Sequence, residues 1–312
     1  MNRFYYSVLL TLILPLVPVK LWWRSIKQPA YRQHWGERFG FYNTAINKPL
    51  NKPIIWLHCV SVGETRAAEP LIKALQATYP NHQILLTHGT PTGREAGEAL
   101  FGNNVNRVYL PYDVPFAVNR FLARFKPSIA LIMETELWFN LIAACKQRHI
   151  PVLLLNARLS EKSAYGYAKL GNLVQEGLQN LTAVAAQTSD DAVRLKNLGA
   201  QNISVVGNLK FDVTASKENI DKGLQLKKQC GDRPVFLAAS TREGEEALIL
   251  DALSKINMPN LLTILVPRHP QRFDTVAALL EQRAINFQRK TLLNNDALLA
   301  NAHVVQIGRA HV

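Results

Sequence analysis

The sequence has few cysteines and lacks the short motifs that define several large protein classes. Its three cysteines, Cys59, Cys145 and Cys230, are far apart in apolar sequence, which predicts neither a disulfide framework nor a zinc site and suits a reducing compartment. No Gly-x-Gly-x-x-Gly follows an apolar run, which argues against a nicotinamide-dependent oxidoreductase. No Asp-x-Asp is present, and only Glu134 and Glu136 could imitate one, so we expect no metal and no other cofactor.

The chain also lacks the composition of a disordered or a polytopic membrane protein. It has 312 residues, of which 48% are hydrophobic, and its mean hydropathy is near zero. These values are typical of a globular protein with room for two domains. The net charge of +13 predicts an anionic partner. No nucleic-acid motif accompanies it, so acidic lipid headgroups or a phosphorylated lipid explain it better, although basic residues can also serve solubility alone.

One stretch without any charge lies at the amino terminus, from Phe4 to Val19. As a helix it would reach about 24 Å, short of a hydrocarbon core of about 30 Å, so a span would need Lys20 to Trp23 as well. We therefore predict a membrane anchor over residues 1–23, which either crosses the bilayer or only dips into it. A cleaved signal peptide is the alternative, but no small-x-small cleavage site follows.

Basic residues dominate the next segment, 24–52, in which Glu37 is the only acid. By the positive-inside rule this charge keeps the body of the protein on the cytoplasmic face, and we expect a bacterial inner-membrane location. The rest of the chain alternates apolar, strand-like runs with amphipathic helical segments. That alternation predicts parallel sheets covered on both faces, in two Rossmann-like domains over residues 53–212 and 213–312 that face a cleft. A single helix is expected from Tyr165 to Leu178.

Charged residues repeatedly follow the strand-like runs. Glu64 comes after 54–57 and a turn at Gly63, Glu134 comes after 128–133, and Lys210 follows 203–206. Because parallel strands deliver their carboxyl ends to one edge of a sheet, these side chains are expected to converge. Glu64 is our candidate for a catalytic base; an ordinary first-turn acid that favours the helix dipole is the alternative.

Motifs in register over nearly the whole chain up to Pro270 identify a family that the sequence resembles. They are Pro29-Ala30-Tyr31-Arg32, Trp35-Gly36-Glu37-Arg38-Phe39-Gly40, Ser61-Val62-Gly63-Glu64, Thr90-Pro91-Thr92-Gly93, Leu110-Pro111-Tyr112-Asp113, Met133-Glu134-Thr135-Glu136-Leu137-Trp138, Asn156-Ala157-Arg158-Leu159-Ser160, Gly207-Asn208-Leu209-Lys210-Phe211-Asp212 and Pro267-Arg268-His269-Pro270. The chain resembles the Kdo transferases, which attach 3-deoxy-D-manno-octulosonic acid (Kdo) to the lipid A precursor of Gram-negative bacteria.

The resemblance implies a GT-B type glycosyltransferase that uses CMP-Kdo as donor and the lipid A precursor, lipid IVA, as acceptor in lipopolysaccharide biosynthesis. Glu64 matches the family's base, and Glu134 and Lys210 match positions that stabilise the transition state. Arg268 and His269 match positions that contact CMP. We add Ser240 and Thr241, which start a predicted helix and offer donors to phosphate. The first domain would bind the acceptor and the second the donor.

Two other functions stay open at this point. Another nucleotide sugar could be the donor, or the chain could be a non-catalytic binder of anionic lipid. The second matters because the family pattern continues beyond Val305 through glycine-rich loops and a His-Asn-Pro motif, none of which is present. Residues 306–312, back-translated, reproduce a sequencing adapter, so we expect an artefact there, an incomplete donor domain and an inactive chain. A genomic stop codon directly after Val312 would contradict this.

Overall fold

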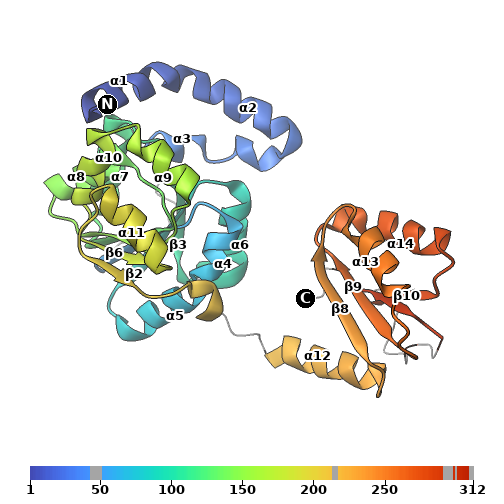
Figure 1. The fold of residues 1–312 in the computed structure, drawn as a ribbon. Coiled ribbons are helices and arrows are strands. Elements are labelled where there is room, and N and C mark those ends of the chain that lie inside the picture. The colour runs from blue at the N-terminus through green and yellow to red at the C-terminus, as the bar shows by residue number, and fades with distance from the viewer. Residues whose placement is uncertain (43–50, 213–216, 291–297, 299–300, 309–312) are drawn as a thin grey trace. The chain divides into compact units, whose positions relative to one another are not determined.

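The computed structural model describes the chain except for residues 43–50, 213–216, 291–297, 299–300 and 309–312. It divides into two compact units, Met1–Thr214 (unit 1) and Ala215–Val312 (unit 2). Both are α/β, with parallel sheets and helices packed against them (Figure 1).

A seven-stranded parallel sheet forms the centre of unit 1. Its strand order is β3-β2-β1-β4-β5-β6-β7, so the order reverses between β1 and β4. The strands are β1 (Ile54–His58), β2 (Gln83–His88), β3 (Asn106–Tyr109), β4 (Ile129–Met133), β5 (Val152–Ala157), β6 (Ala183–Ala186) and β7 (Ile203–Val205). The predicted strand runs of the first domain match these seven closely, because a strand covered on both faces must be apolar along its whole length.

Helices cover both faces of this sheet. Alternate residues of β1 show it: Ile54 and Trp56 belong to one core cluster, together with Phe121, whereas Ile55 and Leu57 belong to a second cluster on the other face. The helices that follow the strands are α4 (Val62–Ala67), α5 (Glu69–Thr78), α6 (Pro91–Phe101), α7 (Pro115–Phe125), α8 (Phe139–Gln147), α9 (Glu161–Ala168), α10 (Asn172–Gln179) and α11 (Ser189–Asn197).

The single helix predicted from Tyr165 to Leu178 is wrong. The structure has two helices there, α9 and α10, and Gly171 lies between them with a φ of 54°. A residue in the left-handed region cannot continue an α-helix, and glycine adopts that region at little cost. The apolar periodicity runs through the break, which is why the pattern alone suggested one helix.

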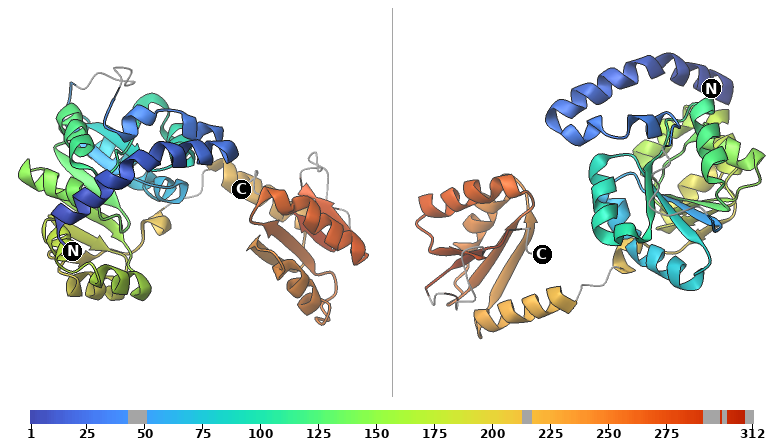
Figure 2. Two further views of the ribbon diagram at one scale, coloured as in Figure 1. Left: turned by 90° about the horizontal axis from the view of Figure 1, so that it is seen from above. Right: turned by 180° about the vertical axis from the view of Figure 1, so that it is seen from behind.

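The charge-free amino-terminal stretch is helical almost throughout. It lies within α1 (Arg3–Ile13), a 3-10 turn η1 (Leu14–Leu16) with Pro15, and α2 (Val17–Lys27), which extend beyond it at both ends. Arg3–Ile26 is long and apolar enough to cross a membrane by length and composition. In all three views it lies along the rest of unit 1, and the chain returns to that part through η2 (Pro29–Arg32) and α3 (Trp35–Arg38) (Figures 1 and 2).

Unit 2 has a four-stranded parallel sheet in the order β10-β11-β9-β8. Its elements are α12 (Lys217–Cys230), β8 (Val235–Thr241), α13 (Glu245–Leu253), β9 (Leu262–Pro267), η5 (Pro270–Arg272), α14 (Phe273–Gln282), β10 (Phe287–Arg289) and β11 (Val304–Gln306). The sequence predicted β8 and β9 but not β10 and β11, which have three residues each. Gln306, the first residue of the suspected adapter tail, closes β11 and pairs with Leu265.

Candidate active site

The point where the strand order of unit 1 reverses is the place where open α/β sheets bind ligands. β1 and β4 are neighbours in the sheet, and their carboxyl ends lead into Glu64 and Glu134, respectively. The charges of these two carboxylates interact, and both also act on the buried thiol of Cys59. The structure therefore brings together two residues that lie 70 positions apart in the sequence at the sheet's topological switch point.

Glu64 occupies the first turn of α4 and is 7% exposed. Its Oε2 accepts a hydrogen bond from the Val60 amide (2.8 Å), and its Oε1 accepts one from the Ser61 hydroxyl (2.7 Å). Ser61 caps the same helix by accepting from the Glu64 amide (3.4 Å). This is close to a capping box, so the side chain has a structural role.

Burial also changes the acidity of Glu64. It raises the pKa of this carboxyl above its usual 4.5, against the opposing bonds from Ser61 and Val60 and with a further rise from the charge of Glu134. A carboxylate with a raised pKa is a stronger base at neutral pH. The residue thus has the chemistry of a general base as well as the geometry of a helix cap.

Glu134 and Glu136 lie in the loop after β4. Glu134 has a φ of 57°, and its amide donates to the carbonyl of Leu155 (2.8 Å). Such a backbone conformation is strained for a non-glycine residue and is concentrated at functional sites. Burial, together with the charges of Glu64 and Glu134, raises the pKa of Glu136 to about 7. Glu136 therefore completes a cluster of three carboxylates.

Lys210 lies in η4 (Leu209–Asp212), which contacts α4, and its side chain is exposed. A network of side-chain amides shapes this segment. Asn156, at the end of β5, accepts from the Leu209 amide through Oδ1 (3.1 Å), and Asn208 accepts from the Lys210 amide through Oδ1 (3.0 Å). Gln187 connects the two asparagines. The cation is therefore presented by a hydrogen-bonded loop.

Asn156 begins one of the motifs that follow the strand-like runs, but nothing in the sequence singled it out as a support for that loop. It is 1% exposed and has a φ of 52°. Asparagine is among the few residues that enter the left-handed region readily. An asparagine directly after an apolar, strand-like run is a signal that could have identified it.

Two buried histidines, His58 and His88, end β1 and β2. His58 Nδ1 lies 2.9 Å from Thr87 Oγ1, and His88 Nδ1 lies 3.1 Å from the carbonyl of Cys59. Burial lowers the pKa of His58 to about 4 and that of His88 to about 3, so both are neutral at pH 7. Within the described part of the chain, no group of three or more His, Cys, Asp or Glu side chains could hold a metal ion.

The basic segment after the anchor is partly built into unit 1. Glu37 forms an ion pair with Arg94 (2.6 Å) and accepts from the amide of Tyr109 (2.7 Å). Arg38, only 5% exposed, lies 4.0 Å from the Tyr109 ring centroid and donates to the carbonyl of Gly89 (3.1 Å). Spacing alone did not reveal this cluster, because its members come from three separate segments of the chain.

In unit 2, the donor-site candidates lie at the ends of two adjacent strands. The amide of Arg268, after β9, donates to the carbonyl of Thr241, the last residue of β8 (3.0 Å). Arg268, His269 and Ser240 are exposed, and Ser240 has a φ of 60°. Thr241 is 3% exposed and donates to Glu246 Oε1 (2.6 Å). The four residues are thus grouped, but the hydroxyl of Thr241 is engaged within unit 2.

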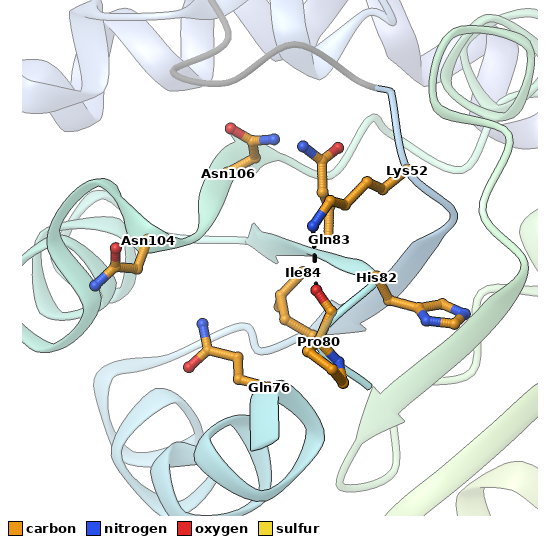
Figure 3. Close-up of a pocket in the computed structure, with 8 residues that line it drawn as sticks. All are labelled: Lys52, Gln76, Pro80, His82, Gln83, Ile84, Asn104 and Asn106. Carbon is orange, nitrogen blue, oxygen red and sulfur yellow. Dashed lines mark hydrogen bonds between the residues drawn. The ribbon is translucent and has the colours of Figure 1, made fainter. Parts of the chain in front are cut away.

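A cavity of about 420 Å³ lies at the amino ends of the strands of unit 1, away from Glu64 and Glu134 (Figure 3). Its lining includes Gln83 and Asn106, where β2 and β3 begin, and Lys52, which donates to the carbonyl of Pro80 (3.1 Å). Because catalytic loops in such sheets follow the carboxyl ends of the strands, we do not assign this cavity to the reaction.

Known proteins share both the sequence and the fold. The family model for 3-deoxy-D-manno-octulosonic-acid transferase (kdotransferase) matches residues 33–213. The chain is 41% identical to the 3-deoxy-D-manno-octulosonic acid transferase of Haemophilus influenzae, covering 93% of this chain and 69% of that protein. It is 40% identical to the enzyme of the same name from Bordetella pertussis, with coverage of 93% and 70%.

Solved structures at low identity support the fold alone. A glycosyltransferase from Rickettsia africae ESF-5 has a TM-score of 0.51 at 15% identity, covering 83% of this chain and 68% of that one. A UDP-GlcNAc 2-epimerase from Neisseria meningitidis bound to UDP-GlcNAc gives 0.52 at 16% identity, with coverage of 82% and 71%. The predicted α/β fold of GT-B type is confirmed. With its family model and these close relatives, the chain belongs to the 3-deoxy-D-manno-octulosonic-acid transferase family of glycosyltransferases.

Proposed function

We propose that this protein transfers Kdo from CMP-Kdo to a lipid A precursor, lipid IVA, with inversion at the anomeric carbon. Glu64 removes the proton from the attacking lipid hydroxyl while the bond to the CMP phosphate breaks. The observation that carries this proposal is the position of Glu64: a buried carboxylate of raised pKa at the switch point of the sheet, beside Glu134.

The other residues take roles that follow from charge. The transition state has oxocarbenium character, so positive charge develops on the sugar and negative charge on the leaving phosphate. Glu134 stabilises the sugar, and Lys210 neutralises the donor's carboxylate or phosphate. In unit 2, Arg268 and His269 bind CMP, and Ser240 and Thr241 add donors to its phosphate. For Thr241 this requires its backbone or a rearranged hydroxyl, since the hydroxyl now bonds to Glu246.

The location follows from the substrates. A nucleotide-activated sugar and a lipid acceptor meet at the cytoplasmic face of a membrane, and we place the protein on that face of the inner membrane of a Gram-negative bacterium. The apolar amino-terminal helix and the basic residues around it support this placement.

The test is transfer from freshly generated CMP-Kdo to tetraacylated lipid A precursor by the wild type and by Glu64→Gln. The assay uses this chain and, if it does not turn over, the chain with the continuation recovered from its gene. Loss of the base should lower kcat by about 10²- to 10⁴-fold and leave lipid affinity unchanged. A non-catalytic lipid binder would show no turnover in any form.

Ser61→Ala is the matched control, because it removes the hydroxyl that caps α4 but keeps the carboxylate. It should cost about 1 kcal/mol of stability and little turnover. If Ser61→Ala and Glu64→Gln lose turnover and stability to the same degree, Glu64 is only a helix cap. Activity with a different nucleotide sugar and none with CMP-Kdo would show that the proposed donor is wrong. The proposed role of Glu64 would remain.

A further inference from the structure

The amino-terminal helical segment, α1 with η1 and α2, has two faces that differ in what they contact. One face lies against unit 1 and carries Tyr6, Ser7, Leu10, Leu14, Val17, Leu21 and Ser25, which are partly or fully buried. The other face is exposed and apolar: Phe4, Val8, Leu12, Leu16, Val19, Trp23 and Ile26. Both sets recur every three or four residues, so each forms one stripe along the helix.

Polar side chains connect the inner face of α1 to unit 1. The Tyr6 hydroxyl donates to Asp113 Oδ2 (2.9 Å), and the Ser7 hydroxyl to Asn140 Oδ1 (2.8 Å). Asp113 is 3% exposed and also accepts from the amides of Asn140 (2.9 Å) and Leu141 (2.8 Å) at the start of α8. The Tyr6 ring packs edge-on against Phe139 at 5.3 Å. These contacts are specific hydrogen bonds, not simply apolar packing.

The other end of the segment returns to the same unit. Leu21 and Ser25 of α2 are 3% and 1% exposed, and Arg32 donates to the Ser25 hydroxyl (3.0 Å). Beyond η2, the carbonyl of Arg38 accepts from the amide of Tyr112 (2.9 Å). Both ends of the segment are therefore held by unit 1.

This arrangement is incompatible with a membrane span. The 24 residues of Arg3–Ile26 make a helix of about 36 Å, and crossing a core of about 30 Å would separate its ends by the full thickness of the bilayer. Tyr6 and Ser7 would then lie across the membrane from Asp113 and Asn140, and their hydrogen bonds could not form.

The exposed stripe and its charges indicate what covers it. No acidic residue precedes Glu37, whereas Arg3, Lys20, Arg24, Lys27 and Arg32 are basic. Trp22 and Trp23 are 57% and 67% exposed, and tryptophan favours the level of the lipid headgroups. An apolar stripe bordered by cations and tryptophans matches a helix that lies in the interface of a membrane with acidic lipids.

We infer that the segment from Arg3 to Ile26 is a monotopic anchor: it stays docked on unit 1 through Tyr6 and Ser7, and its outer stripe lies in the plane of one leaflet of an anionic bilayer without crossing it. This inference does not depend on the sugar that the protein transfers.

Two measurements in cell membranes test the topology. Ser7→Cys paired with Asn140→Cys should form a disulfide on mild oxidation, since those side chains touch. Separately, Asn2→Cys is exposed to an impermeant maleimide in spheroplasts, with Glu161→Cys, an 89% exposed position of α9, as the control for the side of unit 1. We expect both single cysteines to react only after permeabilisation. Labelling of Asn2→Cys in intact spheroplasts, with Glu161→Cys protected, would overturn the inference.

A third measurement tests the bilayer as the partner. Leu12→Glu combined with Leu16→Glu should abolish most cosedimentation of the full chain with vesicles of phosphatidylethanolamine and phosphatidylglycerol. Leu248→Glu is matched in exposure, 70% against 71% for Leu12, and should bind like the wild type. Binding should also fall in vesicles of phosphatidylcholine alone and at high salt. Unchanged binding of the double variant would show that the stripe does not contact lipid.

Discussion

Both units are built from alternating β-strands and α-helices, but they differ in how far their sheets are buried. β1 of unit 1 is buried along its whole length, whereas β8 of unit 2 is largely exposed, with Val235, Phe236 and Leu237 at 45%, 41% and 59%. All five tryptophans and all nine tyrosines precede residue 215, so unit 2 has only phenylalanines as aromatic residues. A parallel sheet depends on covered faces, and unit 1 meets that condition more fully.

The buried acids differ in the same way. In unit 1, Glu64 and its neighbour Glu136 lie in surroundings that raise their pKa values. In unit 2, the fully buried acid among the described residues is Glu246, which Arg272 pairs through both guanidinium nitrogens at 2.8 Å. Unit 1 therefore holds buried carboxyls that keep their protons more readily than free ones, whereas unit 2 holds its buried acid in an ion pair.

The largest effect should come from removing a buried aromatic of unit 1. Trp56 is fully buried, donates to Thr87 Oγ1 (2.8 Å) and contacts Phe121. Trp56→Ala should cost about 3 to 5 kcal/mol, and Phe236→Ala in β8 less than about 1 kcal/mol. Hydrogen exchange resolves the two units, and urea unfolding followed by the remaining tryptophans reports on unit 1. Equal losses would contradict the difference in burial.

An intermediate effect, of opposite sign in the two units, should appear with pH. Because the pKa of Glu136 rises to about 7 in the folded state, unit 1 binds more protons folded than unfolded between about pH 4.5 and 7, and its stability falls as pH rises. Glu136→Gln removes the Glu136 share of that slope, whereas Glu64 and Asp113, whose pKa values are also raised, keep theirs. The variant should stabilise unit 1 at pH 8 by up to about 3 kcal/mol. At pH 4 the variant should match the wild type.

Unit 2 supplies the contrast for that experiment. Burial opposes ionisation of Glu246, but hydrogen bonds from Arg272 and Thr241 outweigh it and lower the pKa. Its stabilising contribution is therefore present at neutral pH and is lost as pH falls below about 4.5. After correction for the intrinsic exchange rate, which itself falls with pH, the amides of unit 2 should lose protection on acidification, the reverse of the Glu136 effect in unit 1. The same pH trend in both units would contradict these assignments.

The contrast also explains what could be predicted from the sequence. The strands of unit 1 could be predicted because double-sided burial imposes continuous apolar runs. β10 and β11 could not, since Phe287–Arg289 and Val304–Gln306 are too short to show a pattern. For the site, strand-end placement led to Glu64 and Glu134, but the raised pKa of Glu136 and the support from Asn156 depend on burial and hydrogen bonds between distant segments.

The smallest effect compares two strand ends with left-handed backbones, Asn156 in unit 1 and Ser240 in unit 2, with φ of 52° and 60°. Substitution by glycine relieves that strain in the folded state but raises the conformational entropy of the unfolded chain. These two contributions to the free energy of unfolding nearly cancel. Ser240→Gly, at an exposed site, should therefore change stability by less than about 0.5 kcal/mol.

Asn156→Gly also loses the hydrogen bond from Leu209 to Oδ1, which should cost about 1 kcal/mol. That bond shapes the loop of Lys210. If Lys210 acts in the reaction, Asn156→Gly should therefore also lower kcat. If the loop only packs against the rest of unit 1, the variant should lose stability and keep its kcat. Asn156→Ala keeps the strain and lacks the bond, so it should be the less stable of the two. If neither Asn156→Gly nor Ser240→Gly changed stability or kcat, the Asn156–Leu209 hydrogen bond would contribute nothing that the end of β8 lacks.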